Sequence, residues 1–117
     1  MHYMLLIYAS EAAWGSASPE AQAAVMRRHD ELERDLRATG RYKGCGALGS
    51  IATATTVRVR DGKPLVTDGP FAEAREQLGG YYLVEAKDLD EAIGIAARIP
   101  GVGNACVEVR PLHDVRF

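Results

Sequence analysis

The stretch GYYLVEAKDLDEAIGIAARIPG, residues 80–101, decides the fold, because a strand pattern in it leads directly into a helix pattern. Residues 81–86 are apolar or aromatic at most positions and alternate between two faces, which is typical of a β-strand. Asp88 and Glu91 then form a capping-box-like pair that predicts the start of a helix, which should end at Pro100. The helix residues expected to face the core are Leu89, Ile93, Ala96 and Ile99.

The N-terminal part of the chain has the same order of elements. His2–Ala9 is apolar on both faces, so it predicts a central strand, and the loop over residues 10–18 ends it. Ser18 as the N-cap, with proline at the first helical position, predicts a long helix that runs to Thr39 and stops at Gly40.

A histidine occupies one position in the apolar stripe of this long helix. The apolar members of the stripe, separated by three, four or seven residues, are Ala21, Val25, Leu32 and Leu36. His29 fills the missing position in this series. We therefore expect its side chain to face inward, toward the space between helix and sheet.

The middle of the chain predicts extended structure. Tyr42–Ser50 is rich in glycine and predicts an irregular strand. Residues 56–67 form two extended runs around Asp61-Gly62, a dipeptide suited to the tight type I′ turn of a hairpin. Residues 72–78 are helix formers and predict a short helical turn, and residues 105–112 predict a last strand.

The resulting order predicts the α+β class, as a ferredoxin-like split β-α-β sandwich with an inserted β-hairpin. One sheet with two helices has only one of its faces covered. The open face, to which Val57 and Val59 would add apolar surface, then needs a cover. A symmetric homodimer is the simplest solution.

Composition limits the classes of function. The 117 residues suit one domain over 1–117, and 47% hydrophobic with 26% charged residues is the mixture of a globular protein. A net charge of −2 offers no broad basic field, so we expect no nucleic-acid partner. The short apolar run at the N-terminus predicts no membrane association and a cytoplasmic location. Cys45 and Cys106 lack CxxC spacing, and no histidine spacing supports a metal site.

Motifs along most of the chain resemble those of the YCII-related, DGPF-domain family. They are MLLIYASE near the N-terminus, VTDGPFAEAREQLGGYYLVEAKDLDEAIGIAARIPG over residues 66–101, and the closing VEVRPL. The resemblance implies a dimeric α+β barrel, in which two ferredoxin-like units pack sheet to sheet. Some relatives have been suspected of enzymatic work by a histidine and an aspartate in a pocket, and one branch resembles a dehydrochlorinase. DGPF members are often encoded beside extracytoplasmic-function sigma factors.

His29 and Asp68 are the candidate catalytic residues, because a carboxylate can orient an imidazole and stabilise its charged form. Each has a structural alternative. His29 could be satisfied by a backbone carbonyl or lie exposed at the edge of the stripe. Asp68 could cap the short helical turn that follows it, with Phe71 packed against the sheet to fix the loop.

Four further residues are candidate binding groups. Glu73 or Glu76 could supply a second acid, and Arg75 could pair with a carboxylate-bearing ligand. Tyr81, the fourth candidate, and Tyr82 point to opposite faces, so one of their hydroxyls could reach the pocket while the other meets a dimer partner or water. The alternative for the three charged residues is a solvated position at the surface, and the alternative for the tyrosines is packing in the core or at an interface.

Besides a purely structural dimer with the remnant of a pocket and no ligand, two classes of function remain open on the sequence alone. One is a small-molecule pocket with cofactor-free acid–base chemistry of the lyase or elimination type. The other is a non-catalytic regulatory module that binds a partner such as an extracytoplasmic-function sigma factor. No nucleotide, flavin or haem motif is present, so we expect no cofactor.

Overall fold

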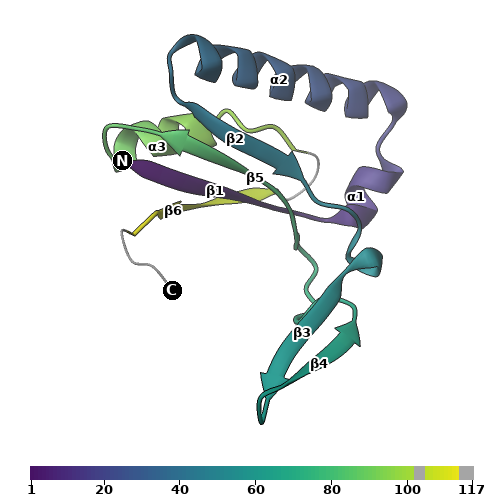
Figure 1. Ribbon diagram of the computed structural model, residues 1–117. Coiled ribbons are helices and arrows are strands. Elements are labelled where there is room, and N and C mark those ends of the chain that lie inside the picture. Colours follow the sequence, from purple (N-terminus) through teal and green to yellow (C-terminus); the bar gives the residue numbers. More distant parts are fainter. Residues whose placement is uncertain (102–104, 114–117) are drawn as a thin grey trace.

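A computed structural model describes residues 1–101 and 105–113 of the chain (Figure 1). Within these residues, no helix is both long enough and apolar enough to cross a membrane. The elements, in chain order, are β1 (His2–Ala9), α1 (Glu11–Ser16), α2 (Pro19–Ala38), β2 (Tyr42–Ala47), the short 3-10 helix η1 (Ile51–Thr53), β3 (Thr55–Arg60), β4 (Lys63–Asp68), β5 (Gln77–Glu85), α3 (Leu89–Ala96) and β6 (Cys106–Pro111).

Four strands form the main sheet in the order β2-β5-β1-β6, with every neighbouring pair antiparallel. The apolar strand β1 is therefore central, as the sequence predicts. In its register, Leu5 lies opposite Tyr82 on β5 and opposite Val109 on β6. The mixed architecture confirms the expected α+β, ferredoxin-like fold.

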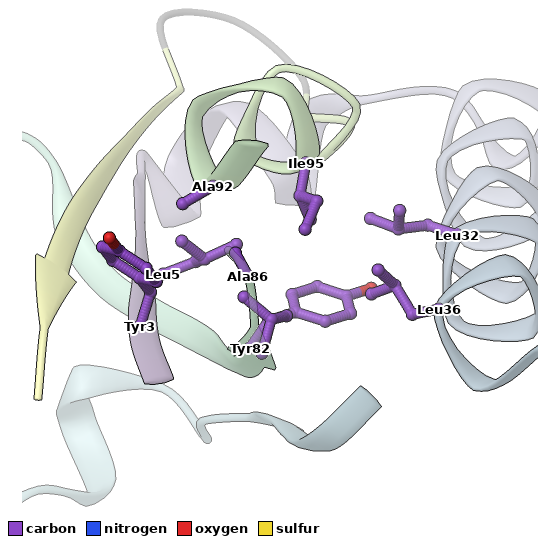
Figure 2. Close-up of a cluster of buried hydrophobic side chains, with 9 residues drawn as sticks. Tyr3, Leu5, Leu32, Leu36, Tyr82, Ala86, Ala92 and Ile95 are labelled. Atoms are coloured by element: carbon purple, nitrogen blue, oxygen red, sulfur yellow. The ribbon is translucent and has the colours of Figure 1, made fainter. Parts of the chain in front are cut away.

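Both long helices, α2 and α3, pack on one face of this sheet. Figure 2 shows the core that they share: Leu32 and Leu36 of α2 point toward Ile95 of α3 and toward Tyr82 of β5. Leu5 and Val84 are completely buried beneath them. This burial removes the apolar side of both helices from water, which is the main force that holds the helices to the sheet.

The start and end of α2 agree with the sequence signals. The Ser18 side chain accepts a hydrogen bond from the Ala21 amide at 3.1 Å, so it caps the first turn. The helix ends at Ala38, with Thr39 as its C-cap, and Gly40 follows with φ of +72°. A glycine adopts this left-handed conformation without the steric cost that a side chain would add.

The β3–β4 hairpin forms its own two-stranded sheet, as the expected inserted hairpin. Asp61 and Gly62 have φ angles of 53° and 74°, which are the positive values that a type I′ turn requires. Figure 1 shows the hairpin projecting from the main sheet on the side opposite α2. Val59 and Val66 are 73% and 66% exposed on it, so the hairpin is largely uncovered in this chain.

Two local predictions are wrong. The segment expected as a loop contains α1, because the Ser10 side chain accepts a hydrogen bond from the Ala13 amide and caps a helical turn. The helical turn expected over residues 72–78 is not formed. Its last residues join β5 instead, where Gln77 and Leu78 pair with β1. Sheet pairing overrides helix propensity here, because propensity is a weak preference.

The orientation of α3 also differs from the prediction. Ala96 and Ile99 pack against the core as expected, but Leu89 and Ile93 are 51% and 49% exposed. The buried residues of the helix are Ala92 and Ile95 instead. A helix of eight residues allows more than one apolar stripe, and the small side chain of Ala92 suits a close approach to the sheet. The Asp88 cap is confirmed, since its carboxylate accepts from the Glu91 amide at 2.9 Å.

We expect Gly80→Ala to destabilise the fold, because a methyl group at this position would lie 2.8 Å from the Gly46 carbonyl oxygen. A rigid backbone atom cannot move aside cheaply, so the free energy of unfolding should fall by about 1–3 kcal/mol. Gly44→Ala is the matched control on β2, because a methyl group there would meet no atom within 4 Å. Urea unfolding measures the free energy of unfolding of both variants. An equal loss of stability in the two would contradict the role assigned to the Gly46 carbonyl oxygen.

Candidate functional site

A cavity of about 610 Å³ lies between the middle of α2 and the sheet. Leu32 and Leu36 of α2 pack on α3 through the shared core, whereas Val25, His29 and Glu33, from the middle of the helix, border the cavity. Residues of α1, β1, β2 and β5 form its other walls. α3, with eight residues against 20 in α2, contributes no residue to this wall.

Most of the cavity wall is apolar, with a few polar side chains. The aliphatic and aromatic contributors include Ile7, Trp14, Val25, Met26 and Leu48. An apolar wall with few polar groups is typical of small-molecule sites, since the apolar part supplies affinity and the polar groups fix orientation.

His29 faces inward, as the stripe on α2 predicts, and it contacts a tyrosine rather than a carboxylate. Its Nδ1 atom lies 2.7 Å from the hydroxyl oxygen of Tyr82. The two rings are stacked, with centroids 5.9 Å apart and an interplanar angle of 13°. Tyr82 reaches this position because strand alternation turns it toward α2, next to Leu36 (Figure 2).

Burial changes the titration of both partners. Burial lowers the pKa of His29 below its usual value, and the negative charge of Asp30 only partly opposes this effect. Burial also raises the pKa of Tyr82, with further contributions from neighbouring negative groups such as Glu33. Near neutral pH, the pair therefore consists of a neutral imidazole and a neutral phenol.

A phenol can either donate to His29 Nδ1 or accept from it, and the choice decides what the other ring nitrogen can do. When the Tyr82 hydroxyl accepts from Nδ1–H, Nε2 carries a lone pair and can accept a proton. When the hydroxyl donates to Nδ1, Nε2 carries the hydrogen and can donate it. Within the described residues, no hydrogen bond engages Nε2. This nitrogen is therefore available to a ligand.

A second polar group borders the cavity next to this pair. Glu33 accepts from Arg37 Nε at 3.0 Å and from the Cys45 thiol at 3.4 Å. The hydrogen bond from Arg37, followed by that from Cys45, lowers the pKa of Glu33. Arg37 is held in turn over the ring of Tyr42, 4.0 Å from its centroid. Glu33 is thus a fixed negative charge on the wall.

The structure does not bring Asp68 to His29 within this chain. Asp68 is the last residue of β4, is exposed, and is not part of the cavity wall. The expected capping role is wrong, because residues 69–76, which follow Asp68 directly, form no helix. Gly69, with φ of +98°, turns the backbone instead, and its amide donates to the Ala54 carbonyl at 2.7 Å.

The remaining candidate residues fall into two groups. Glu73, Arg75 and Glu76 are exposed in the segment between β4 and β5, away from the cavity wall. Tyr81 borders the cavity by its position between Gly80 and Tyr82, but strand alternation turns its side chain to the face of the sheet opposite that of Tyr82. The expectation that Phe71 packs against the sheet is wrong, because its side chain is 79% exposed.

The candidate residues named from the sequence did not include Glu33 or Cys45, and they favoured Tyr81 over Tyr82. The sequence pattern could have predicted Glu33 as a site residue, since it follows His29 by four residues and residues at this spacing share a helix face. No local sequence pattern could have predicted the contact between Tyr82 and His29, because it joins residues 53 positions apart on two different elements. Among the described residues, no cluster of three or more potential metal ligands is found.

We expect the stability of the wild type to fall relative to that of His29→Gln as the pH drops below about 6.5. Since the folded state has the lowered pKa, the unfolded chain takes up a proton first, and this uptake favours unfolding until the folded state is protonated too. Chemical unfolding of both proteins between pH 7.5 and 5 measures the difference. His113→Gln, which changes an exposed histidine, is the control. A difference that does not vary with pH would contradict the buried neutral imidazole.

Comparison with known proteins identifies the family. The YCII-related domain family matches residues 1–116. The chain is also 36% identical over 116 residues to the uncharacterized protein R00369 of Rhizobium meliloti (strain 1021), covering 96% of this chain and 92% of that protein. This match is nearly full-length in both proteins. The chain therefore belongs to the YCII-related family.

Proposed function

We propose that the cavity between α2 and the sheet binds a small molecule and that His29 exchanges a proton with it. The observation that carries this proposal is the contact between His29 and Tyr82, with 2.7 Å between Nδ1 and the hydroxyl oxygen, at the wall of a largely apolar cavity. A titratable group with a shifted pKa in a cavity is a marker of functional sites.

The contact suits acid–base work for a physical reason. Tyr82 holds the imidazole in one orientation and can switch between donor and acceptor, so Nε2 can take up a proton and return it. A lowered pKa leaves the imidazole unprotonated, and hence able to act as a base, near neutral pH. Such a base can remove a proton from a phenol, an enol or a carbon next to a carbonyl.

Elimination is the reaction class that follows when the ligand carries a leaving group. His29 takes a proton from one carbon, the electrons of that C–H bond form a C=C bond, and the leaving group departs from the adjacent carbon with its bonding electrons. This step needs no oxidant or reductant, because the electrons of the broken C–H bond form the new C=C bond and the leaving group departs with its own bonding electrons. His29 is the catalytic residue in this proposal, and Tyr82 is its positioning residue.

The test is a thermal-shift screen of neutral and charged aromatic metabolites against the wild type and three variants. We expect a stabilising ligand to lose its effect in His29→Gln. Tyr82→Phe should weaken the effect by about three- to tenfold in Kd, since one hydrogen bond to the imidazole is lost. Asp68→Asn is the matched control, because Asp68 lies outside the cavity wall.

The outcomes separate the alternatives. A ligand whose binding does not change in His29→Gln would place its site elsewhere and contradict the proposal. An effect of Asp68→Asn as large as that of His29→Gln would mean that Asp68 reaches the cavity from another copy of the chain. For a turned-over ligand, Tyr82→Phe should also shift the pH profile of kcat/KM, which loss of packing alone would not do.

We further propose that a second copy covers the open face of the sheet. Met4 and Leu6 of β1 lie there opposite Leu83 and Tyr81 of β5, all only partly exposed. Neighbouring β6 presents Glu108 and Arg110, which are both exposed. In a two-fold interface, the acidic residue of one copy can meet the basic residue of the other.

Leu6→Arg should shift the protein from dimer to monomer, because the long charged side chain would overpack the interface and would have to leave water. Sedimentation velocity at several concentrations measures the change. Leu89→Arg is the control, since Leu89 is exposed on α3, on the helical side of the sheet. A wild type that sediments as a monomer at every concentration would contradict the dimer.

A second candidate function is a partner-binding module, with an extracytoplasmic-function sigma factor as the partner. The exposed valines of the β3–β4 hairpin favour it, because uncovered apolar surface of this kind marks interaction sites. Purified sigma factor would then bind the wild type and His29→Gln equally. Val59→Asp would abolish this binding.

A further inference from the structure

Among the described residues, the charged side chains on the cavity wall are all acidic. Its wall includes the carboxylates of Glu11, Asp30 and Glu33, and no lysine or arginine of the described residues contributes to it. Arg27 and Arg28 precede His29 on α2, but both are exposed and lie outside the wall.

The three carboxylates differ in how far their charge is compensated. Glu33 is paired with Arg37, whose Nε lies 3.0 Å from its Oε2. Glu11 is held by neutral donors, with the Ile51 amide at 2.7 Å and the Ser50 hydroxyl at 2.9 Å. Asp30 makes no hydrogen bond or ion pair within residues 1–101 and 105–113. Glu11 and Asp30 therefore leave uncompensated negative charge at the cavity.

The remaining polar groups on the wall do not reverse this sign. His29 and Tyr82 are neutral near pH 7, because burial disfavours their charged forms. Trp14, which is 36% exposed, offers an aromatic face that attracts cations. An anion entering this cavity would lose hydration without gaining a cationic partner.

We infer that the cavity takes an apolar-bodied ligand that is uncharged or carries a protonated amine, and that it excludes carboxylates and phosphates. This inference rests on the proposed function, because it assigns the ligand class of the same site. The apolar wall accommodates the body of such a ligand, and the acidic residues attract a cationic head or repel an anionic one.

The test compares indole, tryptamine and indole-3-acetate, which share one ring system and differ in charge. The same comparison is repeated with naphthalene, 1-naphthylmethylamine and 1-naphthoate. Trp14 is the only tryptophan in the chain, so its indole N–H gives a single NMR signal that reports on the cavity itself. Titrations on the full chain give Kd from this signal and from the Gly80 amide, which also borders the cavity.

We expect the amine to bind at least about tenfold more tightly than the carboxylate of the same ring, with the neutral compound in between. Asp30→Asn should narrow this difference by about threefold, since it removes one uncompensated charge. Glu31→Gln is the matched control on α2, because Glu31 is exposed and lies outside the cavity wall. Added salt should narrow the difference in the wild type.

A carboxylate that binds as tightly as the amine, with both signals shifting, would overturn the inference and leave the proposed binding site intact. Equal effects of Asp30→Asn and Glu31→Gln would also overturn it, because the preference would then reflect overall charge. No binding of any compound of either set, together with no stabilising ligand in the broader screen, would overturn the proposed function and this inference with it.

Discussion

The packing of α2 across one face of the four-stranded sheet is the constraint on which the rest of the structure depends. Leu32 and Leu36 anchor its C-terminal half to α3 and the sheet, and Leu5 and Val84 complete the core below them. Residues in the middle of the helix, from Val25 to Glu33, border the cavity. One helix thus supplies both the stability of the fold and the wall of the candidate site.

The site uses the same packing to control chemistry. Tyr82 belongs to the buried face of β5, and its ring packs in the core while its hydroxyl meets His29 at 2.7 Å. The position of the imidazole is therefore fixed by a residue that the fold already requires. Because burial lowers the pKa of His29, the same packing that stabilises the protein also keeps this histidine neutral.

Two surfaces of the molecule lack a cover in this chain. One is the face of the sheet opposite the helices, and the other is the β3–β4 hairpin, on which Val59 and Val66 are exposed. A two-stranded hairpin is only marginally stable by itself, so contact with a neighbour would stabilise it. The hairpin projects on the side of the open face, so one partner could contact both surfaces.

The helix prediction for residues 72–78 failed for a reason that no local pattern reveals. Alanine, glutamate and arginine favour a helix, but Gln77 and Leu78 gain more from pairing with β1. The predicted orientation of α3 was wrong at Leu89 and Ile93, because an eight-residue helix with apolar residues on several sides can pack on the sheet in more than one orientation. The predictions of the helix caps at Ser18 and Asp88 and of the hairpin turn at Asp61-Gly62 were correct. Caps and tight turns depend on residues adjacent in the sequence, so a local pattern is enough to predict them.

The sequence by itself determined the α+β class, the ends of α2, the hairpin turn and the inward direction of His29, because each follows from local signals or from helical periodicity. Only the tertiary structure decided the partner of His29. The sequence suggested Asp68, since a carboxylate is the usual partner of an imidazole, but Asp68 lies at the end of the hairpin, away from the cavity wall. The contact with Tyr82 depends on how α2 lies across β5, and such a contact between distant segments is set by the packing of the whole core.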